Sequence, residues 1–366
     1  MSSSSNAVVL RLKLDVMRVL AIRALRLSPT LAKYAALILA LLNIGSWPLV
    51  WHLRVFSCVM QARLSFNALK LRHLFSGRAT WKLAVQNWHE SRMPIGVHPL
   101  RKVWTYKWSV GIHDSDFLLH MSNSSYAATL DRSRMHLALA TFPTLLRAGG
   151  FAPLAAMHYS FIREIPMFAR YEIRASVGAW DQKWLYVVFR FVLPASRTGK
   201  AKESSPIAGT PMPPANGNGG GDTDPDAVMK ALAARAMNEP EPDGASLCTI
   251  VVNRFCYKLG RISVPPAVVL ASNGFYADRP SAASAQAGSP TPPPYWDAHV
   301  RPLVASVSQL RKFFAGGWRD IPEGQRWWED AFSAVEDERK ARLVTFGGGK
   351  GLSDAMEVVK DISRPT

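Results

Sequence analysis

The fold is indicated most strongly by WTYKWSVGI at residues 104–112, followed after a polar turn by YAATLDRSRMHLALATFPTLLRAGG at residues 126–150. Apolar and polar residues alternate in the first run, which is typical of a β-strand with one buried face. The second run has apolar residues at helical spacing and ends at two glycines, so it predicts one long helix of about 25 residues. A strand and a long helix therefore open the central domain.

Four more runs rich in β-branched and aromatic residues follow the helix. Three of them predict strands over residues 154–165, 168–180 and 183–193, and a fourth over residues 247–264 completes the sheet. An order of strand, long helix and then successive strands predicts an α+β fold with one sheet and one long helix.

The sheet is interrupted by residues 195–246, which contain seven Gly, seven Pro and no aromatic residue in 52 positions. This composition cannot offset the entropy lost on ordering, so it predicts a disordered insertion in which only residues 225–237 could form a short helix. Residues 277–295 predict a flexible linker because they are rich in Ala, Ser and Pro. The remainder, residues 296–366, has helical patterns and predicts a helical C-terminal tail.

Positive charge is concentrated near the N-terminus. The formal net charge is +17, and residues 1–112 hold sixteen Lys or Arg against two acidic residues, which is +14 of that total. A localised basic excess is typical of proteins that bind nucleic acid or an anionic membrane. No RNA-binding signature accompanies the basic residues, so we expect no nucleic-acid partner.

The N-terminal sequence favours a membrane as the partner. Residues 1–33 predict a basic amphipathic helix, which also resembles a mitochondrial presequence. Residues 34–51, YAALILALLNIGSWPLVW, form eighteen positions without a charge and predict a transmembrane segment, although Asn43 and Pro48 leave a re-entrant or interfacial segment open. Residues 52–100, in which aromatic and basic residues are interleaved, predict linker helices at the membrane interface.

The densest polar cluster lies in the turn before the long helix, where the chain places Asp114, Asp116, His120, Asn123 and Tyr126. A helix N-terminus offers unpaired N–H groups that can polarise a carbonyl and hold a developing oxyanion. A carboxylate beside it can attack that carbonyl or activate water. The alternative is that these residues only cap the helix and form an ordinary turn.

The run from Asp114 to Tyr126, DSDFLLHMSNSSY, resembles the D-x-D-x-x-G-H-V-N-N-x-x-Y signature of the 4-hydroxybenzoyl-CoA thioesterase-like hotdog family. The likeness extends to its subgroup of thioesterase superfamily member 6 proteins through the Trp/Leu/Arg-rich stretch at residues 47–64, the run RYEIRASVGAWDQKWLYVVFRF at residues 170–191 and the late sequence GLSD at residues 351–354. The resemblance implies a hotdog domain over residues 101–276, with an antiparallel sheet wrapped around the long helix.

Carried over position by position, the resemblance makes Asp116 the nucleophile or general base, with His120 as a further catalytic residue. The backbone amide near Asn123 matches the donor at the helix end, and Tyr126 matches a tyrosine beside the acyl pocket. Two positions assigned to substrate binding depart from the family pattern, because Leu119 replaces the usual Gly and Ser122 replaces the first of two Asn.

The resemblance implies a membrane-associated thioesterase that hydrolyses an acyl thioester such as acyl-CoA, works as a homodimer and serves lipid metabolism. No cofactor and no metal are expected. The alternative is a catalytically inactive acyl-binding or scaffold protein that keeps the hotdog pocket. The resemblance favours the endoplasmic reticulum membrane as the compartment, and the Arg-rich start leaves the mitochondrion as the alternative.

Overall fold

The computed structural model of the 366-residue chain describes residues 17–18, 29–195, 241, 243–277 and 292–347. Most of the predicted basic N-terminal helix, the insertion with its short helix and the linker therefore lie outside the described residues, as does the GLSD sequence at residues 351–354. The chain divides into two compact units, one formed by residues 1–54 with 111–113 and the other by residues 55–110 with 114–366.

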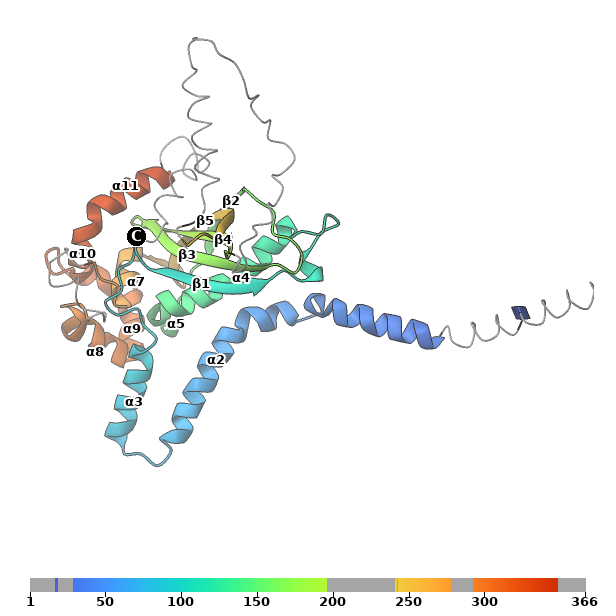
Figure 1. Cartoon of the computed structure of the whole chain (residues 1–366). Coiled ribbons are helices and arrows are strands. Elements are labelled where there is room, and N and C mark those ends of the chain that lie inside the picture. Colours follow the sequence, from blue (N-terminus) through green and yellow to red (C-terminus); the bar gives the residue numbers. More distant parts are fainter. Residues whose placement is uncertain (1–16, 19–28, 196–240, 242, 278–291, 348–366) are drawn as a thin grey trace, which may run out of the picture. The chain divides into compact units, whose positions relative to one another are not determined.

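The second unit contains one antiparallel sheet with the strand order β1-β3-β4-β5-β2 (Figure 1). Every pair of neighbouring strands is antiparallel, and the short strand β6 pairs with the end of β5. The strands are β1 (Val103–Ser109), β2 (Leu154–Phe161), β3 (Arg170–Trp180), β4 (Trp184–Leu193), β5 (Ser246–Leu259) and β6 (Ile262–Val264). The predicted α+β class and the five predicted strand regions are confirmed.

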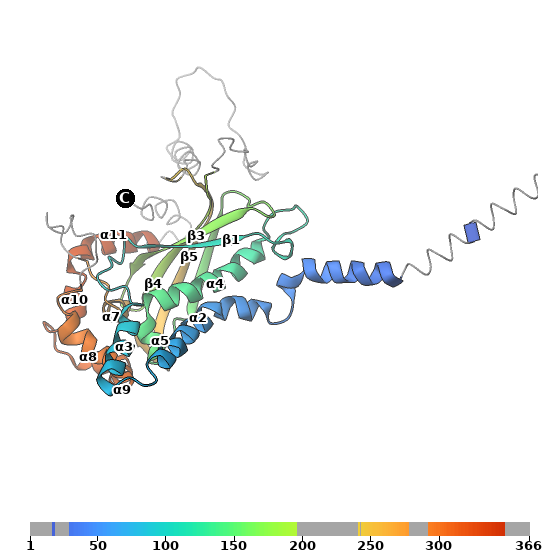
Figure 2. The ribbon, with the colours of Figure 1, turned by 60° about the horizontal axis from the view of Figure 1, so that its bottom comes forward.

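The long helix α4 (Asn123–Thr141) lies along one face of this sheet (Figures 1 and 2). Side chains alternate in direction along a strand, so every second residue of β3 and β4 faces the helix. Ile173 and Val177 on β3 and Phe189 on β4 are buried together with Leu130 and Leu137 of α4. This is the arrangement of sheet and helix that the sequence resemblance implies.

The predicted helix of about 25 residues is wrong in its length. Helix α4 ends at Thr141, and a separate short helix, α5 (Pro143–Arg147), follows it. Phe142 between them has φ −138° and ψ 49°, outside the helical region. The break arises because Pro143 disfavours a helical conformation at the residue before it and has no N–H to donate to the preceding turn.

The strand boundaries also differ from the predictions. The predicted strand over residues 154–165 ends at Phe161, and the chain then runs irregularly through Glu164. The predicted strand over residues 247–264 is split into β5 and β6 by a turn in which Gly260 has φ 59°. Glycine adopts this left-handed conformation without the steric cost that other residues bear.

The C-terminal region is helical, as predicted, but in short pieces. It contains a π-helix (Trp296–Val300), α8 (Arg301–Ala305), α9 (Val307–Phe314), α10 (Trp327–Asp330) and α11 (Glu336–Gly347), with short α7 (Pro266–Ser272) before them. Helix α11 covers the sheet face opposite α4, where Phe346 stacks on Tyr186 of β4 with ring centroids 5.4 Å apart. The C-terminal region therefore adds a second packed layer to the sheet.

The two α-helices directly before β1 form a helical hairpin. Helix α2 (Val50–Arg72) and helix α3 (Arg78–Glu90) are joined by a short turn. Phe66 of α2 packs on Trp88 of α3 with ring centroids 4.8 Å apart, and Arg301 of α8 pairs with Glu90 at 2.9 Å. The hairpin is thus attached to the C-terminal helices.

The continuous transmembrane helix predicted over residues 34–51 is wrong. Residues 29–42 are helical, but a 3₁₀ turn (Ile44–Ser46) and a bend follow, and α2 begins only at Val50. Pro48 lacks the N–H that a helix needs, and Leu49 has φ 68°, in the left-handed region. Within the described part of the chain, no helix combines the length and the apolar character needed to cross a membrane.

Candidate functional site

The turn between β1 and α4 is held by its own backbone. The N–H of Asp116 donates to the carbonyl of His120 at 3.0 Å, and the N–H of Leu119 donates to the carbonyl of Asp116 at 3.1 Å. Leu119 has φ 63°, so it occupies a left-handed conformation that favours glycine. The family pattern has Gly at this position, and here the turn keeps that conformation with leucine in it.

The same turn is attached to the segment that follows β2. The N–H of Met121 donates to the carbonyl of Ile165 at 2.8 Å, and the N–H of Met167 donates to the carbonyl of Leu119 at 2.9 Å. The N–H of Ser122 donates to the carbonyl of Asp114 at 2.9 Å. The first two bonds join the turn to a segment about 40 residues later in the sequence, and the third closes the turn itself.

The carboxylate of Asp116 lies against an imidazole. Its Oδ2 atom is 3.4 Å from Nδ1 of His120, while its Oδ1 atom accepts a 2.9 Å hydrogen bond from the N–H of Leu118. The other ring nitrogen of His120, Nε2, is 3.4 Å from Oε1 of Glu164. His120 is mostly buried, with 18% of its side chain exposed, whereas Asp116 and Glu164 remain open to solvent at 26% and 42%. The arrangement can hold the imidazole in one orientation and leaves a carboxylate accessible to a substrate.

Helix α4 begins beside this pair. Ser122 is the N-cap residue, and its hydroxyl contacts the hydroxyls of Ser124 and Ser125 at 3.1 and 2.9 Å instead of capping a backbone N–H. Asn123, the first helical residue, is exposed. Because the first N–H groups of a helix have no intrahelical acceptor, this end can donate to an oxygen atom and favours negative charge.

Tyr126 lies deeper than the other predicted site residues. It is 2% exposed, and its ring packs against Phe161 and Phe191 with centroids 5.2 and 4.9 Å away. Burial raises the pKa of its hydroxyl, which therefore stays protonated at neutral pH. Tyr126 is thus a residue of the hydrophobic core next to the turn.

Large apolar side chains of the turn, and of the segment attached to it, are exposed. Phe117 and Leu118 at the tip of the turn are 90% and 60% exposed, and Leu119 is 63% exposed. Phe168, which follows the segment attached to the turn, is 66% exposed. Large exposed apolar side chains gathered beside a carboxylate are typical of a surface that contacts a lipid, an acyl group or another protein.

The structure brings together Asp116 and His120, and it places Leu119, Ser122 and Asn123 along the same turn and helix start. It does not place Tyr126 at the surface beside Asp116 and His120, because Tyr126 is buried. Glu164 was missed by sequence reasoning, since it lies 44 residues after His120 in the sequence and belongs to no spacing motif. In the described residues, no group of three or more His, Cys, Asp or Glu side chains is arranged to hold a metal ion.

Comparisons with known proteins found a matching family model and several relatives. Residues 110–204 match the family model described as the thioesterase-like superfamily. A probable thioesterase of Saccharomyces cerevisiae is 36% identical over 83 residues, which cover 22% of this chain and 36% of the yeast protein. Thioesterase poxG of Penicillium oxalicum is 31% identical over 179 residues, which cover 44% of this chain and 50% of that protein.

Protein THEM6 of Xenopus laevis is 28% identical over 154 residues, which cover 42% of this chain and 69% of the frog protein. The matched part spans only a third to a half of the length of the yeast and Penicillium relatives. Among solved structures, the Dynemicin thioesterase matches with 12% identity and a TM-score of 0.30, covering 47% of this chain and 95% of that one.

Proposed function

Because the chain contains a thioesterase-like domain of the hotdog superfamily, we propose that it hydrolyses an acyl thioester, with acyl-CoA as the expected substrate. The observation that carries the proposal is the contact between Asp116 and His120 beside the exposed start of α4. This arrangement supplies a carboxylate to act on a carbonyl carbon and N–H donors to stabilise the oxygen of that carbonyl.

In this mechanism Asp116 is the catalytic carboxylate. As a nucleophile it attacks the thioester carbon, the thiolate leaves and is protonated, and water then hydrolyses the resulting anhydride. As a general base it instead takes a proton from the attacking water. In both routes the backbone N–H groups at Asn123 hold the negative charge that develops on the carbonyl oxygen. His120 contacts both Asp116 and Glu164 and positions the catalytic carboxylate.

The substrate would be held by the surroundings of this carboxylate. The exposed side chain of Leu119 offers apolar surface to an acyl group, and the hydroxyl of Ser122 lies at the helix start where the carbonyl would bind. Tyr126 supports this region from behind through its contact with Phe161.

A non-catalytic acyl-binding or scaffold protein is the second candidate function. The observation that favours it is the pair of departures from the family pattern, since Leu119 takes the left-handed position of a glycine and Ser122 replaces an asparagine. A bulkier side chain at that position reduces the room for a substrate beside the turn.

A panel of acyl-CoA substrates of increasing chain length separates the two candidates. The thioesterase proposal predicts release of free thiol with saturation kinetics and a preference for one range of chain lengths. Saturable binding of the same acyl-CoA compounds without thiol release would instead support the binding protein. If the compounds were neither bound nor hydrolysed, both candidate functions would be contradicted.

We also propose that the chain acts as a side-by-side homodimer. Strand β2 is at the edge of the sheet and pairs with β5 on one side only. Edge strands leave backbone groups available for pairing with another chain. Light scattering after gel filtration should give twice the mass of 40.4 kDa, and a monomer at micromolar concentration would contradict the proposal.

A peripheral association with a membrane is proposed for the N-terminal segment. Exposed apolar side chains recur along the helical residues 29–42 and along α2, among them Leu37, Leu41, Leu53 and Leu64. Apolar and basic residues that alternate along a helix favour a position at the interface of an anionic bilayer. The compartment proposed is the endoplasmic reticulum, with the mitochondrion as the alternative, and fluorescence microscopy of the full chain distinguishes them.

The membrane proposal is tested with phosphatidylcholine vesicles that contain a quarter phosphatidylserine. Replacing both Leu37 and Leu41 with Gln should move the protein from the vesicle pellet to the supernatant. The matched control is Leu83→Gln, because Leu83 is an exposed leucine of α3. If all variants pelleted equally with the vesicles, the proposed membrane contact through Leu37 and Leu41 would be contradicted.

A further inference from the structure

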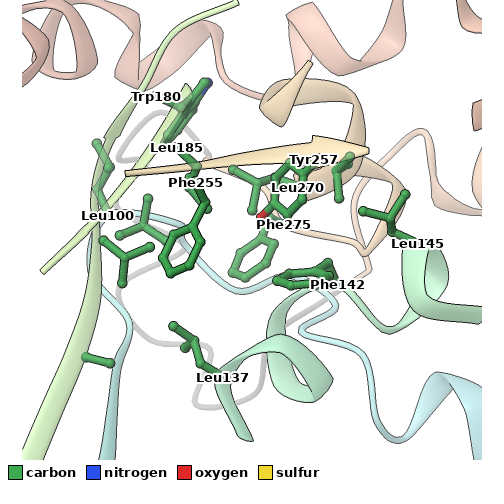
Figure 3. Close-up of a cluster of buried hydrophobic side chains, with 14 of the residues drawn as sticks. Leu100, Leu137, Phe142, Leu145, Trp180, Leu185, Phe255, Tyr257, Leu270 and Phe275 are labelled. Atoms are coloured by element: carbon green, nitrogen blue, oxygen red, sulfur yellow. The ribbon is translucent and has the colours of Figure 1, made fainter. Parts of the chain in front are cut away.

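A cavity of about 260 Å³ lies between the C-terminal half of α4 and the sheet. Its walls are almost entirely apolar and come from α4, from β3, β4 and β5, and from α7. Figure 3 shows Leu137, Phe142, Leu185, Phe255 and Leu270 from these elements facing one another. Ala138 of α4 and Phe151 lie on the more exposed side of the lining. A space of this size with apolar walls suits an apolar molecule.

One polar atom in the cavity wall has no partner. Tyr257 of β5 lines the cavity and is completely buried, and its hydroxyl makes no hydrogen bond to any described residue. Its phenolic oxygen, drawn in red in Figure 3, faces the interior of the side-chain cluster. A buried hydroxyl without a partner is unfavourable, so its position points to a ligand with an oxygen atom. Burial raises the pKa of Tyr257, so the hydroxyl remains a donor at neutral pH.

The charged groups of the lining neutralise each other. Nη1 of Arg134 is 2.6 Å from Oδ1 of Asp131. The side-chain amide of the buried Asn253, with its oxygen turned toward the guanidinium, accepts from Nε of Arg134 at 2.9 Å. The charge of this guanidinium is therefore compensated by Asp131, and the described lining contains no further Lys or Arg to attract a carboxylate or phosphate. A neutral ligand suits these surroundings.

The cavity is separate from the carboxylate and imidazole pair described above. Helix α4 begins at Asn123, and its residues that line the cavity run from Asp131 to Thr141. At a rise of about 1.5 Å per residue, the lining starts roughly 12 Å from the helix N-terminus and extends to roughly 27 Å. A molecule held within the cavity lies away from Asp116 and His120.

We propose that this cavity is a second binding site, which takes a neutral, elongated apolar molecule whose oxygen accepts a hydrogen bond from Tyr257. An apolar cavity of about 150 Å³ holds benzene, so by proportion this one holds about ten carbon atoms. The ligand class is therefore a medium-length alkyl or acyl chain that carries a carbonyl or hydroxyl group. The site does not depend on the proposed thioesterase activity, since its ligand need not react.

The hydrogen bond is tested with two ligands of nearly the same shape, 2-decanone and 2-methyl-1-decene, which differ in having an oxygen or a CH₂ group at one position. Calorimetric titration of the purified full chain should show that the ketone binds on the order of fivefold more tightly, as expected for one buried hydrogen bond. Tyr257→Phe should lose the preference for the ketone, because the buried carbonyl oxygen then has no donor. Equal affinity of the unmodified chain for the two ligands would overturn the assignment of Tyr257.

The location is tested by filling the cavity. Ala138→Phe places a ring in the lining and should abolish binding of 2-decanone. The matched control is Ala128→Phe, because Ala128 is exposed on the same helix outside the lining and its replacement should leave binding unchanged. Thermal melting checks that both variants are folded. No binding of either ligand to the unmodified chain, or unchanged binding to folded Ala138→Phe, would overturn the proposal.

Discussion

Nε2 of His120 lies 3.4 Å from Oε1 of Glu164, while Nδ1 of the same ring lies 3.4 Å from Oδ2 of Asp116. In the proposed mechanism, Glu164 therefore acts on Asp116 through the imidazole as a positioning residue. Misplacing a reacting group can lower the rate by roughly a hundredfold. We expect Glu164→Gln to lower kcat by less than this and to leave KM unchanged. Glu323→Gln, at an exposed glutamate of the C-terminal region, is the control. A change confined to KM would contradict the positioning role.

Replacing Leu119 with Gly should stabilise the protein. Leu119 has φ 63° and is largely exposed, so it bears the steric cost of the left-handed region without gaining much from burial. That cost is about 1–2 kcal/mol, and glycine loses about 0.5–1 kcal/mol through its greater freedom in the unfolded chain. A net gain of about 0.5–1 kcal/mol in the free energy of unfolding is expected in urea titration.

The control for this substitution is the neighbouring residue. Leu118 is equally exposed, at 60%, but it does not have a positive φ. Leu118→Gly should therefore lower stability by a few tenths of a kcal/mol to about 1 kcal/mol. Stabilisation by both glycines, or by neither, would contradict the attribution to the backbone conformation of Leu119.

His89 should titrate far below an ordinary histidine. Burial, with Arg147 and Arg92 nearby, lowers its pKa to about 4. Between that value and about 6.5 the unfolded chain binds a proton that the folded chain does not, so stability falls as the pH drops through this window. An NMR titration of the His89 ring protons checks the pKa. His89→Phe should reduce the pH dependence of the melting temperature in the same window, and an unchanged dependence would rule out His89 as its source.

The contact between β3 and α11 depends on a glycine. A Cβ atom at Gly178 would lie 2.7 Å from Cζ of Phe346, so the ring must move aside. Gly178→Ala should therefore lower the free energy of unfolding by about 1–3 kcal/mol, the range typical of an overpacked core. In the background of Phe346→Ala, which removes the ring, the same substitution should cost much less. Equal costs in both backgrounds would contradict this account of the packing.

Much of the fold was predictable from local patterns. Strand β1 and the strands after the long helix follow from alternation and β-branched residues, although β1 ends at Ser109 and not at residue 112. The start of α4 follows from the polar residues at 122–124. The end of α4 was not predicted, because the apolar spacing continues past Pro143 and hides the break. The N-terminal span was mispredicted because absence of charge does not require a continuous helix, and the chain bends at Pro48.

The site was predictable only in its local part. Asp116 and His120 are four residues apart and meet because the turn between them closes on itself. Tyr257 reaches its place through strand pairing, and Glu164 through the hydrogen bonds that attach the segment after β2 to the turn. Single-sequence patterns do not determine either of these long-range contacts. The deep position of Tyr126 likewise depends on packing against Phe161 and Phe191, which come from two different strands.

The most direct test of the central claim is the value of kcat/KM for Asp116→Asn on the acyl-CoA that the unmodified chain hydrolyses best. Asparagine keeps the size of the side chain but removes the negative charge that attacks the carbonyl or takes a proton from water. Asp114→Asn, which alters the other carboxylate of the same turn, is the control. We predict a loss of about a hundredfold or more for Asp116→Asn and a much smaller change for Asp114→Asn; unchanged activity of folded Asp116→Asn would contradict the proposed mechanism.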